Sequence, residues 1–144
     1  MLLPYRYRVY TWTVRGQPIP APRLTQASAR HPVIPRGYYA FKQAVRTALL
    51  DAYRTDPMLA STIVGYGWPF RFVDGRSGAV AICEYALHMA RAKTGTCRHG
   101  DPDNIAKAIL DALFGDDRHV LPRCMTLTCG SLDPRVEITL TLLE

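Results

Sequence analysis

The sequence lacks any long hydrophobic segment. A helix that spans a bilayer needs about 20 consecutive apolar residues, and no run approaching that length occurs in the 144 residues. The first residues, Met1 to Arg6, also lack the apolar stretch of a secretory signal peptide. We therefore expect no membrane-spanning helix, no membrane partner and no export of the protein.

Cysteine is scarce and shows no metal-binding spacing. The four cysteines are Cys83, Cys97, Cys124 and Cys129, and no two of them form a CxxC pair. A chain of this size can bury a sizeable core without disulfide bonds, so we expect reduced thiols in an intracellular protein. One weak alternative stays open, a zinc-binding interaction module in which Cys97 and His99 act with Cys124 or Cys129.

Acidic residues are outnumbered. Eighteen lysines and arginines face twelve aspartates and glutamates, which gives a formal net charge of +6 and a pI near 9.4. Such a surface favours anionic partners, with nucleic acid first and an acidic membrane surface second. No internal repeat, low-complexity tract or linker interrupts the chain, so residues 1–144 are expected to form a single domain.

Hydrophobic patterning predicts an α+β fold with mixed helices and strands. In the segment 135–143, apolar and polar side chains alternate from Arg135 to Leu142, as they do in a half-buried strand. Residues 37–53 repeat apolar side chains at three- and four-residue steps, as an amphipathic helix does. Residues 58–78, broken by glycine and proline, are expected to be a loop. The sequence thus predicts a mixed sheet of about four strands (5–14, 79–89, 120–128 and 135–143) packed with two main helices (37–53 and the segment after Gly100).

The few acids gather at that second helix. Asp101 or Asp103 can cap its N-terminus, where free backbone amides favour a carboxylate. At 100° per residue, Asp103, Lys107 and Asp111 share one polar stripe, while Ile105 and its neighbours at helical spacing face the core. Asp116 and Asp117 follow the helix after a short link.

Two interpretations of these acids are open. Capping and i,i+4 ion pairing with Lys107 account for Asp103 and Asp111 as ordinary helix features. They account less well for the Asp101-x-Asp103 pair, because neighbouring like charges repel unless a cation joins them. A hard divalent cation such as Mg²⁺ takes carboxylate oxygens, so acids concentrated in a basic chain predict a metal-dependent nuclease.

The residues at this helix resemble the signature of the RusA family of Holliday junction resolvases, largely a phage and prophage group. Residues 101–113 read DPDNIAKAILDAL, which is similar to the family pattern D-x-D-N-h-x-K-x-h-L-D-A-L. Residues 116–120, DDRHV, resemble its D-D-x-x-V sequel. Residues 16–23, GQPIPAPR, resemble its G-x-P-x-P-K-x-R start. The resemblance covers most of the chain in order and implies one RusA-like endonuclease domain.

The resemblance also implies roles for individual residues. Asp101, Asp103 and Asp117 match the essential acids of the family and would bind Mg²⁺, for which Mn²⁺ is expected to substitute. Lys107 matches the catalytic lysine. Supporting roles fall to Asn104, Asp111 and Asp116.

The family implies a homodimer in the cytoplasm of a bacterial or phage-infected cell, without a small-molecule cofactor. It would resolve four-way DNA junctions by paired nicks that leave ligatable 5′-phosphate ends. We expect the DNA backbone to be held by basic residues, whose contacts make binding salt-dependent: Arg15, Arg23, Arg30, Lys42, Arg46, Arg91, Lys93 and Arg98. Two alternatives stay open, a junction-binding protein without cleavage and a metal-dependent nuclease of other branched or single-stranded DNA.

Overall fold

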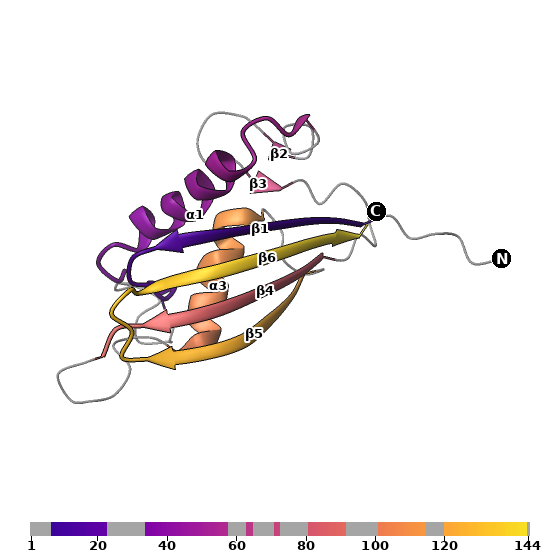
Figure 1. The fold of residues 1–144 in the computed structure, drawn as a ribbon. Helices are drawn as coiled ribbons and strands as arrows, with labels where there is room; N and C mark the ends of the chain where they lie inside the picture. Colours follow the sequence, from indigo (N-terminus) through magenta and orange to yellow (C-terminus); the bar gives the residue numbers. More distant parts are fainter. Residues whose placement is uncertain are drawn as a thin grey trace, which may run out of the picture.

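The described part of the fold is built on a four-stranded mixed β-sheet with two main helices packed against it (Figure 1). The structure is a computed structural model that describes residues 7–22, 34–57, 63–64, 71–72, 81–91, 101–114 and 120–143. The side chains of residues 63–64, 71–72 and 143 are not described. This architecture confirms the α+β class and the single small domain expected from the hydrophobic pattern.

The sheet combines antiparallel and parallel pairing. Its strands are β1 (Tyr7–Arg15), β4 (Ala81–Met89), β5 (Val120–Cys129) and β6 (Arg135–Leu143). They lie in the order β1-β6-β4-β5. The last strand of the chain, β6, pairs antiparallel with both β1 and β4, and β5 pairs parallel with β4. The C-terminal strand is therefore central, and β1 and β5 form the two edges.

The alternation of β6 sets which side of the sheet is buried. Val136, Ile138 and Leu140 are fully buried, whereas the residues between them are only half-buried. Register pairs Ile138 with Trp12 on β1 and with Tyr85 on β4, and both of these are also buried. One face of the sheet thus forms the core, as the two-residue period predicts.

Two helices cover that face. Helix α1 (Tyr38–Ala52) follows Gly37, whose φ of 82° lies in the left-handed region that glycine adopts without strain. The indole Nε1 of Trp12 donates to the carbonyl of Val45 at 3.1 Å and so ties α1 to β1. Helix α3 (Pro102–Leu113) crosses behind the strands in Figure 1 and buries its apolar side between α1 and the sheet.

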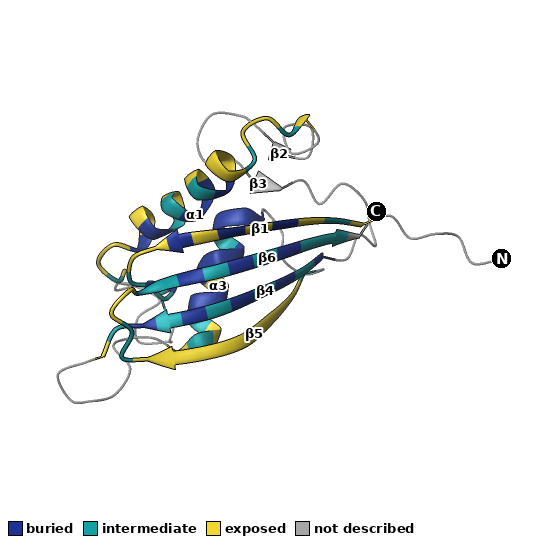
Figure 2. Cartoon of the chain, in the orientation of Figure 1, coloured by how far each residue is buried: buried dark blue, intermediate teal, exposed yellow. Residues whose placement is uncertain are grey.

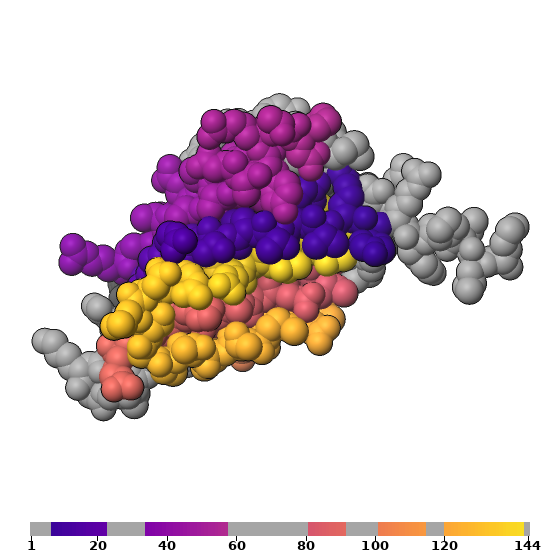
Figure 3. Space-filling view, viewed as in Figure 1, coloured from indigo at the N-terminus to yellow at the C-terminus, as the bar shows by residue number. Residues whose placement is uncertain are grey.

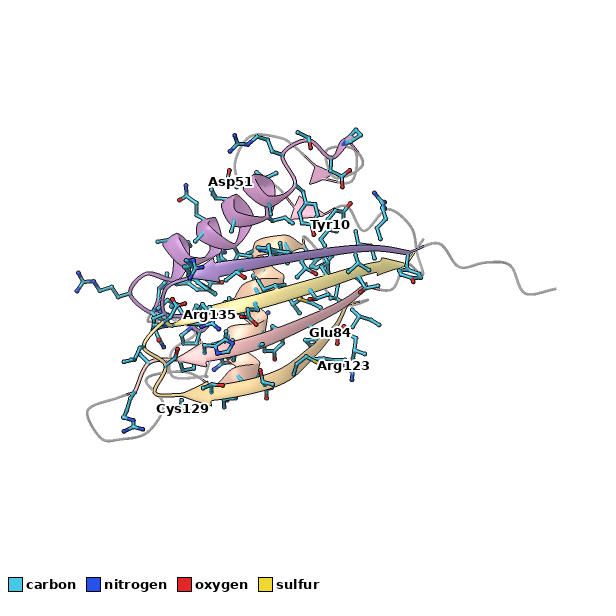
Figure 4. The ribbon with its side chains drawn as sticks, viewed as in Figure 1. Tyr10, Asp51, Glu84, Arg123, Cys129 and Arg135 are labelled. Carbon is cyan, nitrogen blue, oxygen red and sulfur yellow. The ribbon has the colours of Figure 1, made fainter. Side chains whose placement is uncertain are left out.

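The opposite face of the sheet is not covered by either helix. Figure 3 shows β1, β6, β4 and β5 side by side across the molecule. Glu84 on β4 and Arg123 on β5 stand in register on this face (Figure 4). Strand β5 is exposed along almost its whole length (Figure 2), including Leu121, Met125 and Leu127. Helix α3 contacts this edge strand but leaves most of it exposed.

Two expectations are corrected here. The segment 58–78 was predicted to be a loop, but it contains two short strands, β2 (Ile63–Val64) and β3 (Arg71–Phe72), which pair antiparallel. Four reduced thiols were expected, but Cys129 is in a disulfide bond. Cys83 and Cys124 are free, as predicted. No helix in the described part of the chain is long and apolar enough to cross a membrane.

Candidate metal-binding end of helix α3

Two of the predicted catalytic acids lie at the N-terminus of α3. Asp101 is the N-cap residue, with extended φ and ψ of −61° and 124°, and its Oδ1 accepts a hydrogen bond from the backbone N–H of Asp103 at 3.1 Å. Pro102 occupies the first turn, where its missing N–H has no helical partner to lose. Both carboxylates are exposed. Of the two capping residues considered from the sequence, Asp101 is the one that caps.

The two acids act electrostatically on side chains of the sheet, and both of them act on Tyr85. The phenol of Tyr85 on β4 is buried, which raises its pKa to about 12, and the charges of Asp103 and Asp101 contribute to this rise. The pKa of the Cys124 thiol on β5 is also raised, first by desolvation and then by the charge of Asp103. Helix α3 contacts both β4 and β5, and the effects of the two acids on Tyr85 and Cys124 agree with a position of its acidic end beside these strands.

The N-terminal motif and the acidic helix meet in space. The backbone N–H of Ala21 donates to the carbonyl of Asn104 at 2.9 Å. Closer to the N-terminus in the same loop, the side-chain oxygen of Gln17 accepts a hydrogen bond from the backbone N–H of Ala90 at 2.9 Å. Ala90 is the residue that follows β4. Asn104 thus anchors the proline-rich loop through its backbone carbonyl. Segments more than 80 positions apart along the chain, Ala21 and Asn104, are brought together at one end of α3.

Lys107 and Asp111 lie on the polar side of α3, as the helical spacing predicts. The Nζ of Lys107 is 3.5 Å from Oδ1 of Asp111, and their side chains are 56% and 32% exposed. The other carboxylate oxygen of Asp111 accepts a hydrogen bond from the hydroxyl of Tyr38 on α1 at 3.3 Å. The i,i+4 pairing that we considered as the ordinary interpretation is therefore present, but it also connects to the other helix.

Three of the predicted DNA contacts lie on exposed or half-buried positions. Arg15 is exposed at the end of β1 and pairs with Asp133 at 3.1 Å. Arg91 is exposed beyond β4, and its guanidinium lies against the turn at Gly130. Lys42, on α1, holds its ammonium 4.7 Å from the ring centroid of Tyr38. All three side chains can present positive charge to a polyanion.

Arg46 requires a correction. We expected it to contact DNA, but it is only 4% exposed, and its Nε donates to the carbonyl of Ala112 at 2.7 Å. That carbonyl belongs to the last turn of α3, where backbone acceptors lack intrahelical donors and where the helix dipole favours a cation. The guanidinium of Arg46 therefore joins α1 to α3 inside the fold instead of facing solvent.

The remaining site predictions fall outside the described residues. These are the acids Asp116 and Asp117 and the basic residues Arg23, Arg30, Lys93 and Arg98. Within the described ranges no group of three or more His, Cys, Asp or Glu side chains is arranged to hold a metal ion. The described part of the site thus supplies two carboxylates, Asp101 and Asp103.

Sequence reasoning missed several neighbours of the site. Tyr85 and Cys124 approach the acids only because β4 and β5 pair in parallel, with these two residues in register. Tyr38 is buried in the core, and nothing in its local sequence indicates its hydrogen bond to Asp111. No local pattern signals such contacts, since the partners are distant in sequence.

Comparison with known families agrees with these observations. The model of the endodeoxyribonuclease RusA family matches residues 15–141. This range begins at the last residue of β1, and it includes both main helices and most of β6, together with both motifs that meet at Asn104. None of the curated proteins matches the chain at a significant level. Because the family match extends over most of the chain, this protein belongs to the RusA endodeoxyribonuclease family.

Proposed function

We propose that this protein is a Mg²⁺-dependent endodeoxyribonuclease that nicks four-way DNA junctions. The observation that carries the proposal is the pair of exposed carboxylates, Asp101 and Asp103, at the N-terminus of α3 within the signature of its family. Their charge stands out in a chain whose formal net charge is +6. Endodeoxyribonuclease activity is the activity of the family, and the choice of metal and junction is our proposal.

The donor set fits a hard divalent cation. Mg²⁺ prefers one or two carboxylates and keeps several water molecules, and Asp101 and Asp103 provide oxygen donors that solvent can reach. Asp117 is proposed as a third ligand. Once bound, the ion would supply positive charge next to the scissile phosphate and would acidify a water molecule there.

The protein contributes the rest of the charge stabilisation. Lys107 lies one helical turn from Asp103, with its ammonium on the exposed side of α3. A preorganised cation at this place would stabilise the negative charge that develops on the phosphate during attack. Supporting roles are proposed for Asp111, which holds Lys107, for Asn104, which holds the proline-rich loop, and for Asp116.

Positive side chains would hold the phosphate backbone of the junction. The described ones are Arg15, Lys42 and Arg91, and Arg23, Arg30, Lys93 and Arg98 are proposed with them. Each phosphate that they neutralise would add about 0.9 to the slope of log affinity against log salt. Junction binding should therefore weaken steeply between low and physiological salt.

A four-way junction is resolved by two nicks, and we propose that a homodimer makes them with one site per subunit. The two nicks would leave 5′-phosphate ends that a ligase can seal. The proposed setting is the cytoplasm of a bacterial or phage-infected cell, where branched DNA arises during recombination and repair.

A substrate panel tests this function. Purified protein is incubated with a four-way junction, a flap and a linear duplex, each with Mg²⁺ or with EDTA, and Mn²⁺ is tested in place of Mg²⁺. We expect paired nicks in the four-way junction that require the metal. Equal cleavage of flaps would reassign the substrate, and binding without cleavage would contradict the enzymatic proposal.

A further inference from the structure

A chain of polar contacts runs from the core to the exposed lysine of α3. The hydroxyl of Tyr38 donates to Oδ2 of Asp111 at 3.3 Å, and Oδ1 of Asp111 is 3.5 Å from Nζ of Lys107. Exposure increases along it, because Tyr38 is 7% exposed and the side chains of Asp111 and Lys107 are 32% and 56% exposed. One carboxylate thus connects a buried phenol to a cation at the surface.

The donor end of this chain is fixed. Tyr38 belongs to the core cluster, and the ammonium of Lys42 lies 4.7 Å from the centroid of its ring. The ring centroids of Tyr38 and Tyr39 are 5.3 Å apart. The pKa of Tyr38 is raised to about 12, first by burial and then by the charge of Asp111 and the hydrogen bond to it, while Arg46 opposes the rise. The phenol therefore stays protonated near neutral pH and remains a hydrogen-bond donor.

The hydrogen bond from Tyr38 restricts the rotation of the Asp111 carboxylate, and this determines how firmly Asp111 holds the ammonium of Lys107. An isolated, exposed i,i+4 ion pair contributes only a few tenths of a kcal/mol and holds a flexible side chain poorly. A carboxylate whose second oxygen is bonded to the core loses rotational freedom, so its remaining oxygen offers one direction to the ammonium. Supporting hydrogen bonds of this kind are what keep a functional group in place.

Lys107 pairs with the acid on its C-terminal side, and this choice affects the proposed metal site. Lys107 pairs with Asp111, one turn towards the C-terminus, and Asp103 lies one turn the other way. A lysine drawn to Asp103 would neutralise a carboxylate that is proposed to bind Mg²⁺. Its pairing with Asp111 would leave Asp103 to the proposed metal ion and keeps Lys107 one helical turn from that acid.

We propose that Tyr38 is a positioning residue for DNA cleavage, which acts through Asp111 to hold the ammonium of Lys107. The inference rests on the proposed function, because it assigns a role to Tyr38 in the same reaction. Tyr38 touches neither DNA nor metal in this account. Its removal should lower the rate of the chemical step while junction affinity stays the same.

The test compares two neighbouring tyrosines in the full-length protein. Tyr38→Phe removes the donor and keeps the ring, and Tyr39→Phe removes the hydroxyl of an exposed neighbour. Because this hydrogen bond acts on Lys107 only through Asp111, only part of its energy reaches the cleavage step, and single-turnover cleavage at saturating protein should slow about three- to tenfold. Tyr39→Phe should cleave at the wild-type rate, and the two variants should bind the junction equally. An unchanged rate for Tyr38→Phe would overturn the proposal.

A double-mutant cycle separates positioning from general stability. If Tyr38 acts only through Asp111, then Tyr38→Phe should cost nothing more in an Asp111→Ala background. An equal fold-loss in both backgrounds would make the effect of Tyr38 independent of Asp111 and would contradict the inference. Asp111→Ala itself should slow cleavage at least as much as Tyr38→Phe does.

A readout without cleavage keeps the inference distinct from the proposed function. The order of the Lys107 ammonium can be followed by nitrogen NMR of the lysine side chain in wild type, Tyr38→Phe and Tyr39→Phe. We expect increased mobility in Tyr38→Phe alone. Unchanged mobility would refute the positioning role, whereas a wild type that cuts no junction would refute the proposed function and leave this measurement to decide the role of Tyr38.

Discussion

Replacing Arg46 by methionine tests how α1 and α3 are held together. Arg46 is 4% exposed, and its Nε donates to the carbonyl of Ala112 at 2.7 Å. Methionine keeps much of the apolar volume and adds no charge, so the change removes mainly the hydrogen bond and the cation at the end of α3. The carbonyl of Ala112 would lose this donor in a buried setting.

The contacts of Arg46 determine how much stability Arg46→Met should lose. A hydrogen bond that involves a charged group contributes about 1.5 to 3 kcal/mol, and a partly buried cation at a helix C-terminus contributes up to about 2 kcal/mol. Because one guanidinium makes both interactions, they are not summed, and we expect the free energy of unfolding to fall by about 2 kcal/mol. For a chain of this length that lowers Tm by about 4 to 8 °C.

Lys42→Met is the matched control, one turn earlier on the same helix. The Nζ of Lys42 lies 4.7 and 5.6 Å from the ring centroids of Tyr38 and Tyr39. Cation–π contacts at such a position contribute about 1 kcal/mol or less to stability. Calorimetry should show the larger loss for Arg46→Met, and junction titrations at several salt concentrations should show the lower salt slope for Lys42→Met. A normal Tm for Arg46→Met together with weakened junction binding would refute the structural role of Arg46.

Three further predictions concern titration and catalysis. Burial raises the pKa of Cys83 from 9.0 to about 12, so above pH 9 the unfolded chain loses a proton that the folded chain keeps. Denaturant titrations should therefore show that the free energy of unfolding falls by up to about 1.4 kcal/mol per pH unit. Cys83→Ala, if it folds, should make that slope smaller, and an unchanged slope would contradict the prediction. Asp103→Asn removes a charge that raises the pKa of Cys124. Iodoacetamide should therefore label Cys124 faster in this variant at pH 8, as measured by peptide mass spectrometry. An unaltered labelling rate would mean that Asp103 lies too far from Cys124 to affect its thiol. Lys107→Ala should bind junctions normally and lose most turnover in a nicking assay, and an undiminished rate would make Lys107 structural.

The elements with strong local signals were predictable from the sequence. Strand β6 has the bounds predicted for it, Arg135–Leu143, because the two-residue period holds from Arg135 to Leu142. Helix α3 begins at Pro102 after the Asp101 cap, as its capping residues indicate. Its polar stripe of Asp103, Lys107 and Asp111 follows from helix geometry alone. The family signature then gives these positions their proposed roles.

The rest depends on partners that are distant in sequence. Arg46 looks like a surface cation because its partner, the carbonyl of Ala112, lies 66 positions away. The bond between Tyr38 and Asp111 joins residues 73 apart. The central place of β6 in the sheet follows from pairing on both sides. The disulfide of Cys129 was missed because chain length argued only that disulfides were not needed.

The central claim is that acids at the N-terminus of α3 support metal-dependent cleavage, and one comparison tests it most directly. Wild type and Asp103→Asn are incubated with the same four-way junction and Mg²⁺, with junction binding measured in parallel. We predict that wild type nicks the junction and that Asp103→Asn binds it equally or more tightly without nicking. Metal-dependent nicking at the wild-type rate by Asp103→Asn would contradict the account.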